Sequence, residues 1–463
     1  MNRLFVLNSN TVHRGAPGRR AASPHGASLA RLFLFLLVAG LAWLDIKPVL
    51  AAKVPEIIGR IVKGAEEFDP IRVGVNAFVV KDPDETGLDA EVAARLVSQV
   101  VFDDLDFSYL FESVRPDTLY MRIMGLTEID LRGWRHLGAG YLIQGEAEIV
   151  DGNLSVSYVL SDLLNDRTIF KRKLKTKQSS ARLLAHTLAD EVYQELITAP
   201  GIFQSRLAYL HAEGSYKEVH VCDYDGAGDL AVTADRSVVV SPRWAGPNAI
   251  SYTSFLHGNP DVWILDLDRD RATKLSSRPG LNSGCAWSRD GKRYVLSLSL
   301  EGDPEIYIGE RSSAEPRRLT FSRGIDASPS FSPDGKHIIF TSDRSGTPQI
   351  YIMDDDGANV ERITFLGHYN ESPDWSPTLD MIAYVSRIEG VFQILTARPD
   401  GSAVMQLTEV GSNENPHWSP DGLHLVFSSN RTGAYEVYVM NYNGSGVRRI
   451  TNSGNNTNPS WSP

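Results

Sequence analysis

The second half of the chain repeats one short aromatic motif at a nearly constant interval, and this repeat limits the fold more than any other feature. Each copy places a Trp or Phe in a context such as the Trp-Ser-Pro-Asp-Gly of residues 418–422. The steps between copies are 43, 44, 44, 43 and 43 residues, and the aromatic residues are Trp244, Trp287, Phe331, Trp375, Trp418 and Trp461. A four-stranded propeller blade occupies about 40–45 residues. The repeat therefore predicts an all-β propeller over residues 201–463.

Each repeat has the same internal order. An apolar strand such as 337–341 follows the aromatic turn, and a second strand such as 349–353 comes next. An Asp-Gly or Asn-Gly pair then precedes a short last strand, and such pairs favour tight hairpins because Gly readily adopts positive φ. The aromatic side chain has the size and shape to fill the wedge between neighbouring sheets. We expect one four-stranded sheet per repeat.

The number of repeats predicts six blades. The strand after the aromatic turn occurs six times, at 207–210, 249–252, 294–298, 337–341, 381–385 and 424–428. The first copy lacks a preceding aromatic motif, whereas the chain ends with an unpartnered one at 459–463. We therefore expect the C-terminal strand to complete the first blade and close the ring.

Residues 71–200 have a different pattern and predict an α/β domain. Strands and helices alternate here, which implies a small sheet covered by helices. Pro200-Gly201 marks the boundary with the propeller. The expected strands are 71–80, 141–149, 154–163 and 168–176, and the expected helices are 88–104, 129–137 and 181–196.

The N-terminus carries an export signal. Residues 1–31 contain five Arg and no acidic residue, and an apolar run of 13 residues follows at 32–44. Such a run suits the core of a signal peptide better than a membrane span, and Ala51-Ala52 offers a cleavage site. We predict a signal peptide over 1–52, a flexible segment over 53–70, and a mature protein that is soluble outside the cytoplasm. An uncleaved membrane anchor is the alternative.

Composition excludes several classes of function. The formal net charge is −11, which argues against an extended nucleic-acid-binding surface. The two cysteines, Cys222 and Cys285, are too few for a disulfide framework; we expect two small core residues, with a single disulfide as the alternative. Asp354–Gly357 has the composition of a calcium loop, but it falls where every repeat has its turn. No catalytic, cofactor-binding or metal-binding motif occurs, so neither a cofactor nor an enzyme activity is expected.

Three segments carry a resemblance to a known family. They are the junction 201–209 (GIFQSRLAY), the tract 137–145 (LGAGYLIQG) and the turn 223–226 (DYDG). Together with the order of signal peptide, α/β domain and propeller, they make the chain resemble the TolB family of the Tol–Pal system over nearly its whole mature length. The resemblance implies a non-enzymatic periplasmic protein that supports outer-membrane integrity and cell division. It also implies two partners, Pal at the propeller and TolA at the mature N-terminus, other Tol–Pal components, and peripheral association with the outer membrane through Pal.

The candidate binding residues fall into two groups. Polar segments precede the aromatic motifs and lie, by symmetry, around one mouth of the ring, where the resemblance implies Pal binding; stabilisation of turns is the alternative role. This rim comprises Asn282, Ser283, Gly284, Asp326, Ala327, Ser328, Asn370, Glu371, Asn413, Glu414, Asn415, Asn456 and Asn458. Leu281 stands where the family often has His. For TolA, the resemblance implies the segment 53–69, and a disordered or edge-strand leader is the alternative. The candidates are Val54, Glu56, Ile57, Ile58, Ile61 and Val62.

Two other classes of function remain as alternatives. A propeller enzyme would use channel carboxylates such as Glu371 and Glu414, and a free-standing propeller would bind a small ligand or glycan. The α/β domain argues against the second alternative, because it resembles the N-terminal domain of the TolB family.

Overall fold

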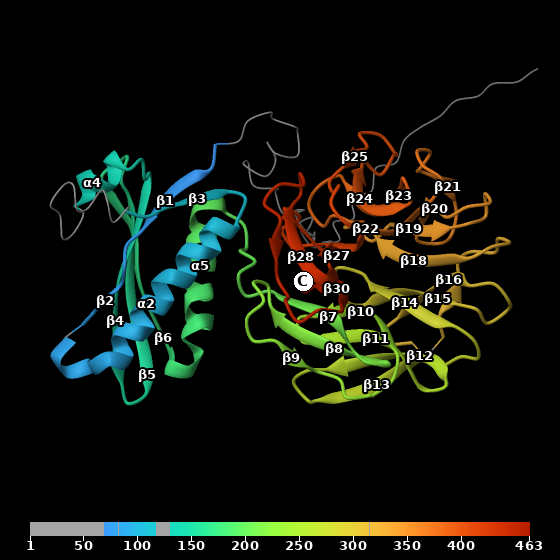
Figure 1. Cartoon of the computed structure of the whole chain (residues 1–463), viewed down its shortest axis with the longest axis horizontal. Helices are drawn as coiled ribbons and strands as arrows, with labels where there is room; N and C mark the ends of the chain where they lie inside the picture. Colours follow the sequence, from blue (N-terminus) through green and yellow to red (C-terminus); the bar gives the residue numbers. More distant parts are fainter. Residues whose placement is uncertain (1–68, 82, 117–129, 314) are drawn as a thin grey trace, which may run out of the picture. The chain divides into compact units, whose positions relative to one another are not determined.

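The computed structural model describes residues 69–81, 83–116, 130–313 and 315–463 (Figure 1). The predicted signal peptide (1–52) and all but the last two residues of the predicted flexible segment (53–70) lie outside this range. The candidate TolA-binding residues therefore lie outside the described residues: Val54, Glu56, Ile57, Ile58, Ile61 and Val62. In the described part of the chain, no helix has both the length and the apolar character to cross a membrane.

The N-terminal region is a mixed sheet with helices on one face (Figure 1). The strand order is β3-β1-β4-β5-β6, and β2 also pairs with β4. Strand β1 pairs in parallel with β3 and β4, and β2 also pairs in parallel with β4, whereas β4, β5 and β6 form an antiparallel meander. The strands are β1 (Ile71–Val75), β2 (Val79–Val80), β3 (Phe111–Val114), β4 (Tyr141–Val150), β5 (Asn153–Asp162) and β6 (Arg167–Lys177). The helices are α2 (Pro83–Phe107), α4 (Leu131–His136), η1 (Gln178–Ser180) and α5 (Ala181–Ile197).

Alternation in the strands explains which face the helices cover. In β5, Leu154, Val156, Tyr158 and Leu160 are buried in the same core cluster as apolar residues of α2 and α5. Side chains at alternate positions of a strand point to one face, so these four form a continuous apolar surface for the helices. Between the helices, Nδ1 of His186 lies 2.9 Å from a carboxylate oxygen of Asp104. The core of this domain thus lies between the sheet and the helix pair.

Most sequence-predicted elements of this domain are confirmed. The helices expected at 88–104 and 181–196 are α2 and α5, and the three strands of the meander have nearly the expected bounds. The prediction of one strand over 71–80 is wrong in one respect. This segment forms two strands, β1 and β2, which pair with different parts of β4. Strand β3 was not predicted from the sequence.

Residues from Arg206 onward form six four-stranded antiparallel sheets (Figure 1). The innermost strands are β10 (Val239–Gly246), β14 (Asn282–Trp287), β18 (Asp326–Phe331), β22 (Asn370–Trp375), β26 (Asn413–Trp418) and β30 (Asn456–Trp461). The second strands are β7 (Arg206–Glu213), β11 (Ala249–His257), β15 (Arg293–Leu298), β19 (His337–Ser342), β23 (Ile382–Ile388) and β27 (His424–Thr432). The third strands are β8 (Tyr216–Asp223), β12 (Asn259–Asp266), β16 (Glu305–Glu310), β20 (Gln349–Asp354), β24 (Val391–Ala397) and β28 (Ala434–Asn441). The outer strands are β9 (Leu230–Ala231), β13 (Arg271–Ser276), β17 (Arg317–Arg318), β21 (Glu361–Arg362), β25 (Met405–Gln406) and β29 (Arg448–Arg449).

The ring closes as the sequence predicts. Strand β30 pairs antiparallel with β7, so the first blade has the order β30-β7-β8-β9. The indole nitrogen of Trp461 donates to the hydroxyl of Ser205 at 2.7 Å, and the backbone N–H of Ser462 donates to the carbonyl of Arg206 at 2.8 Å. The last strand and the first are thus joined by main-chain and side-chain hydrogen bonds. The six-bladed fold with C-terminal closure is confirmed.

The repeated aromatic residues lie between blades, as expected. The indole nitrogen of Trp244 donates to the carbonyl of Ser460 in the neighbouring blade at 3.1 Å, and that of Trp418 donates to the carbonyl of Asp374 at 3.2 Å. The two cysteines are free and buried, so the disulfide alternative is wrong and both are core residues.

Candidate functional site

The innermost strands surround a central channel. Each of them lies against the next around the ring, and β30 lies against β10. We call the end of the channel where these strands begin the N-mouth, and the end where they finish, at the Ser-Pro-Asp-Gly turns, the C-mouth. The predicted binding rim belongs to the N-mouth, because its residues occupy the first positions of β14, β18, β22, β26 and β30.

Every innermost strand is interrupted by a β-bulge at the same position. The pairing of each strand with its second strand shifts register there. One residue per strand has a φ between 50° and 66°, in the left-handed region of backbone conformation. Five of these six residues are not glycine, and residues with a side chain rarely adopt this conformation. A bulge bends the strand and changes the direction of the following side chains. The six residues line the channel: Ser241, Gly284, Ser328, Ser372, Asn415 and Asn458.

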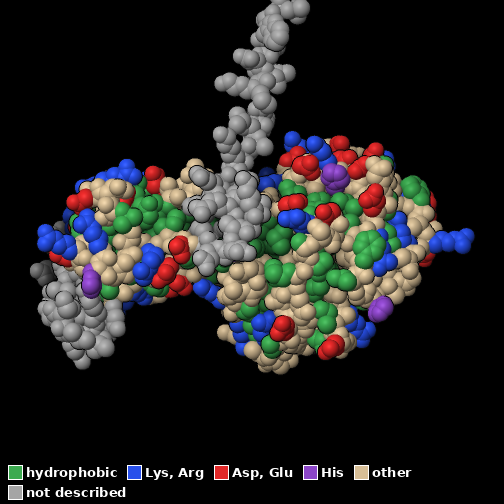
Figure 2. Space-filling model, turned by 90° about the horizontal axis from the view of Figure 1, so that it is seen from above, with side chains coloured by type: hydrophobic (Ala, Val, Ile, Leu, Met, Phe, Trp, Pro, Cys, Tyr) green, Lys and Arg blue, Asp and Glu red, His purple; other side chains and the backbone are tan. Residues whose placement is uncertain are grey.

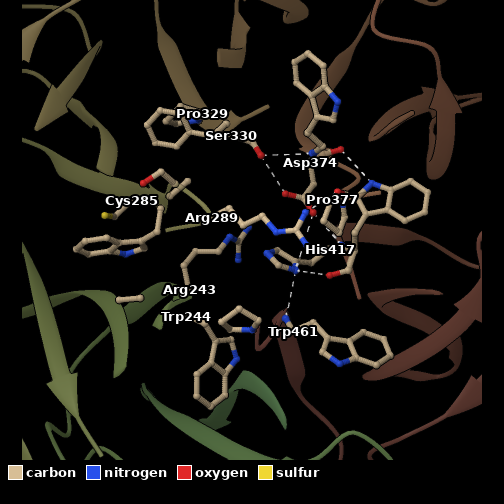
Figure 3. Close-up of a pocket in the computed structure, with 18 of the residues that line it drawn as sticks. Arg243, Trp244, Cys285, Arg289, Pro329, Ser330, Asp374, Pro377, His417 and Trp461 are labelled. Atoms are coloured by element: carbon tan, nitrogen blue, oxygen red, sulfur yellow. Dashed lines mark hydrogen bonds and ion pairs between the residues drawn. The ribbon is translucent and has the colours of Figure 1, made fainter. Parts of the chain in front are cut away.

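A cavity of about 600 Å³ extends from these bulges to the turns of the C-mouth. Figure 3 shows side chains of Arg243, Arg289, Asp374 and His417 meeting in its centre. Arg243, Asp374 and His417 each come immediately before the aromatic residue of their own blade. Several Trp and Pro residues line the walls together with Ser and Asn, so the cavity surface is part apolar and part polar.

Asp374 and His417 are fixed by hydrogen bonds to neighbouring blades. The Asp374 carboxylate accepts from the hydroxyl of Ser330 at 3.2 Å and from the backbone N–H of Trp418 at 2.9 Å. Nδ1 of His417 accepts from the backbone N–H of Trp461 at 3.3 Å. Burial lowers the pKa of His417; the charge of Asp374 opposes this shift and that of Arg243 adds to it. The imidazole is therefore neutral near pH 7.

The first residue of each predicted rim segment is a structural residue. All five side chains are buried, and the amide of Asn413 shows their role: it donates to Gln393 of the preceding blade at 2.9 Å and accepts from Arg431 at 2.9 Å. Asn370 and Asn456 make equivalent bonds to the preceding blade. Such side chains are not available to a partner. The five are Asn282, Asp326, Asn370, Asn413 and Asn456.

The second rim residues are partly exposed at the N-mouth, and two of them are acidic. Glu371 accepts from the hydroxyl of Tyr369 at 2.9 Å, and Glu414 accepts from that of Tyr435. Burial and the nearby charge of Glu414 raise the pKa of Glu371, against the effect of the Tyr369 hydrogen bond. Ser283 and Ala327 hold the equivalent positions. The third rim residues, Gly284, Ser328, Asn415 and Asn458, are the bulge residues that line the channel.

Apolar side chains at the N-mouth were missed from the sequence. Phe321, Phe365, Leu366 and Val410 are 75%, 72%, 65% and 63% exposed. They lie in the connections from the outer strand of one blade to the innermost strand of the next, and these connections end at the N-mouth. A signal for two of them is present in the sequence, because Phe321 and Phe365 directly follow a Leu-Thr or Ile-Thr pair where a polar turn is expected. The N-mouth therefore combines acidic groups with a set of exposed apolar groups.

Other chemistries find less support in the described residues. Within residues 69–81, 83–116, 130–313 and 315–463, no group of three or more His, Cys, Asp or Glu side chains is placed to hold a metal ion. Basic and acidic side chains are interspersed over the face that Figure 2 presents, and no large basic field is visible there.

Two family models match the chain. The model described as the TolB beta propeller domain matches residues 193–463, and the model described as the TolB amino-terminal domain matches residues 60–169. The first alone covers more than half of the chain.

Individual proteins give the same result. A Tol-Pal system protein TolB of Desulfosudis oleivorans is 36% identical over 251 residues, which is 51% of this chain and 56% of that protein. A protein of the same name from Dinoroseobacter shibae is 34% identical over 54% of this chain and 57% of its own length. The matches thus span little more than half the length of these relatives. The crystal structure of TolB from Acinetobacter baumannii superposes with a TM-score of 0.73 and 26% identity, covering 86% of this chain and 97% of that one.

Proposed function

The chain belongs to the TolB family, and from this premise we propose that it is a non-enzymatic periplasmic docking protein of a Tol–Pal system. Family membership supports a role in that system. The fold is consistent with docking, since a closed ring of blades offers a rigid rim with little backbone to reorder on binding.

In this proposal the N-mouth is the surface that binds a Pal-type lipoprotein. The observation that carries it is the set of exposed apolar side chains in the connections that end at the N-mouth, together with the partly exposed Glu371 and Glu414 at the strand starts; the apolar set is Phe321, Phe365, Leu366 and Val410. Exposed aromatic groups next to polar groups are typical of protein interfaces, where a few large side chains supply most of the affinity. Of the predicted rim, Ser283, Gly284, Ala327, Ser328, Glu371, Glu414, Asn415 and Asn458 remain candidate contacts.

The second partner is TolA, bound by the segment 53–70. This part of the proposal rests on the resemblance of the sequence. Deletion of residues 53–69 is expected to abolish TolA capture and to leave Pal capture intact. Loss of both in a folded deletion variant would reject this division of roles.

The experiment that tests the docking proposal is affinity capture. The mature protein, immobilised through a tag, is incubated with a detergent extract of the cell envelope, and bound proteins are identified by mass spectrometry. We expect a Pal-type lipoprotein with the wild type and much less with the double variant Phe321→Ala/Phe365→Ala. The matched control is Leu230→Ala/Met405→Ala, which removes exposed apolar groups from outer strands. Capture that is equal for both variants would contradict the proposed surface.

A further inference from the structure

Three arginines line the C-mouth half of the channel, and none of them forms an ion pair within 4.0 Å in the described part of the chain, although the charge of Asp374 acts on Arg243. Arg243 donates to the carbonyl of Pro242, and Arg311 donates to that of Ala245, each at 2.9 Å. Arg289 donates to the carbonyl of Pro377 at 3.0 Å, and Pro377 belongs to a blade two places further around the ring. A guanidinium group has five N–H donors, so each retains several for another acceptor.

These guanidinium groups are held in position before any ligand binds. The Arg311 guanidinium carbon lies 5.3 Å from the ring centre of Trp287, a cation–π distance, and Arg289 is anchored on the far side of the channel by its bond to Pro377. Arg243 comes directly after the bulge at Ser241 and Pro242, and Figure 3 shows its side chain directed to the centre of the cavity. Ordered groups lose little conformational entropy on binding, which favours affinity.

The cavity holds more basic than acidic side chains. Among the side chains of its lining are the three arginines and two carboxylates, Asp290 and Asp374, while His417 is neutral; Pro463, the last residue of the sequence, also lines the cavity. Both carboxylates already accept hydrogen bonds from the protein, from Ser288 in one case and from Ser330 in the other. Three arginines are therefore gathered in one cavity of a chain of net charge −11, and their remaining N–H groups are donors available to an acceptor.

We propose that this cavity is a binding site for a carboxylate ligand. Arg243 binds the carboxylate at the deep end, Arg289 and Arg311 flank the opening, and the Trp and Pro walls cover the carbon skeleton of the ligand. The planar guanidinium group is suited to this role because it binds a carboxylate through two parallel hydrogen bonds. A volume of about 600 Å³ is that of a site for a small molecule or a short peptide segment. The arginines lie in the C-mouth half, whereas the exposed apolar groups of the docking surface lie at the N-mouth; the bulge residues between them line the cavity and are also candidate docking contacts.

The test measures binding of defined probes to the mature protein. Succinate represents a free carboxylate, and the peptide Gly-Gly-Pro with a free C-terminus represents a carboxylate carried by a peptide. Succinamide and the C-terminally amidated peptide are the uncharged controls. Calorimetry gives the affinity, and intrinsic fluorescence reports the site directly because Trp244, Trp287, Trp375, Trp418 and Trp461 line the cavity.

We expect at least one carboxylate probe to bind more tightly than its amide, and the pair that responds identifies the source of the ligand. Arg243→Gln should weaken that binding about tenfold or more, because the charge-assisted bonds are lost. Arg271→Gln, on the exposed outer strand β13, should leave it unchanged. If R243Q does not fold, the exposed Arg289→Gln gives the same test. Equal affinity for acid and amide, or binding that is insensitive to both cavity variants, would overturn the proposal. Lipoprotein capture by R243Q is expected to be normal, so failure here is distinct from failure of the docking proposal.

Discussion

The closing strand gives the most quantitative prediction. Trp461 is 2% exposed, packs in a cluster with Leu207 and Val426, and donates its indole N–H to Ser205. Trp461→Ala removes this buried side chain and leaves a cavity between the first blade and the last. Truncation of a buried Trp costs about 3–5 kcal/mol, and loss of the hydrogen bond adds about 1 kcal/mol. We therefore expect the propeller to lose about 4–6 kcal/mol of unfolding free energy.

Urea denaturation followed by far-UV circular dichroism measures this loss, because that signal does not depend on the removed fluorophore. Trp375→Ala is the matched control: it holds the same position in its blade, but its side chain is partly exposed, so the loss should be clearly smaller. Ser205→Ala removes only the hydrogen-bond acceptor and should cost about 1 kcal/mol. A loss below about 1 kcal/mol for W461A, or equal losses for W461A and W375A, would refute the role assigned to ring closure.

Two further predictions concern pH and the blade junctions. Burial raises the pKa of Asp104 to about 6, and the pKa of His186 is also raised, since the hydrogen bond and the charge of Asp104 outweigh the opposing effect of burial. The folded state then holds more protons than the unfolded state, so the stabilising effect is fully present below pH about 4 and is lost as pH rises through about 6 and beyond. Thermal unfolding from pH 4 to 8 should show this decline, and Asp104→Asn should flatten it; an unchanged slope would contradict the assignment. Asn413→Ala should lower the free energy of unfolding by about 1–3 kcal/mol, because the buried side chain of Gln393 loses its hydrogen bond to Asn413. Glu414→Gln, one residue along and partly exposed, should leave stability within about 0.5 kcal/mol in the same denaturation assay.

The sequence predicted the architecture because the aromatic residues recur at fixed spacing and each fills the same place between two blades. It failed for the innermost strands, whose beginnings look like loops. The segment Asn413-Glu414-Asn415 lacks the alternation of a half-buried strand. Asn413 is buried and hydrogen-bonded, Glu414 is partly exposed, and Asn415 lies in the bulge. A polar bulged strand beside a water-accessible channel has no simple periodic pattern.

The residues of the candidate site were predictable to different degrees. The sequence placed the polar segments at one mouth of the ring, where they lie, but it could not distinguish buried from exposed members, since the partner of Asn413 is Gln393, 20 residues earlier in another blade. Arg243, Asp374 and His417 were missed because each lies immediately before an aromatic residue, a position that the repeat itself does not mark as facing the channel. Aligning the position before each aromatic residue would have placed Arg243 in register with Asp374 and His417, and so in the channel.

The claim that the N-mouth is a docking surface is tested most directly by the affinity of the mature protein for the soluble domain of a Pal-type lipoprotein from the same cell. Isothermal titration calorimetry with wild type, F321A/F365A and the L230A/M405A control gives the comparison. We expect the wild type and the control to bind alike, and the N-mouth variant to bind about tenfold or more weakly with unchanged thermal stability. No binding by the wild type, or equal binding by a folded F321A/F365A variant, would contradict the account.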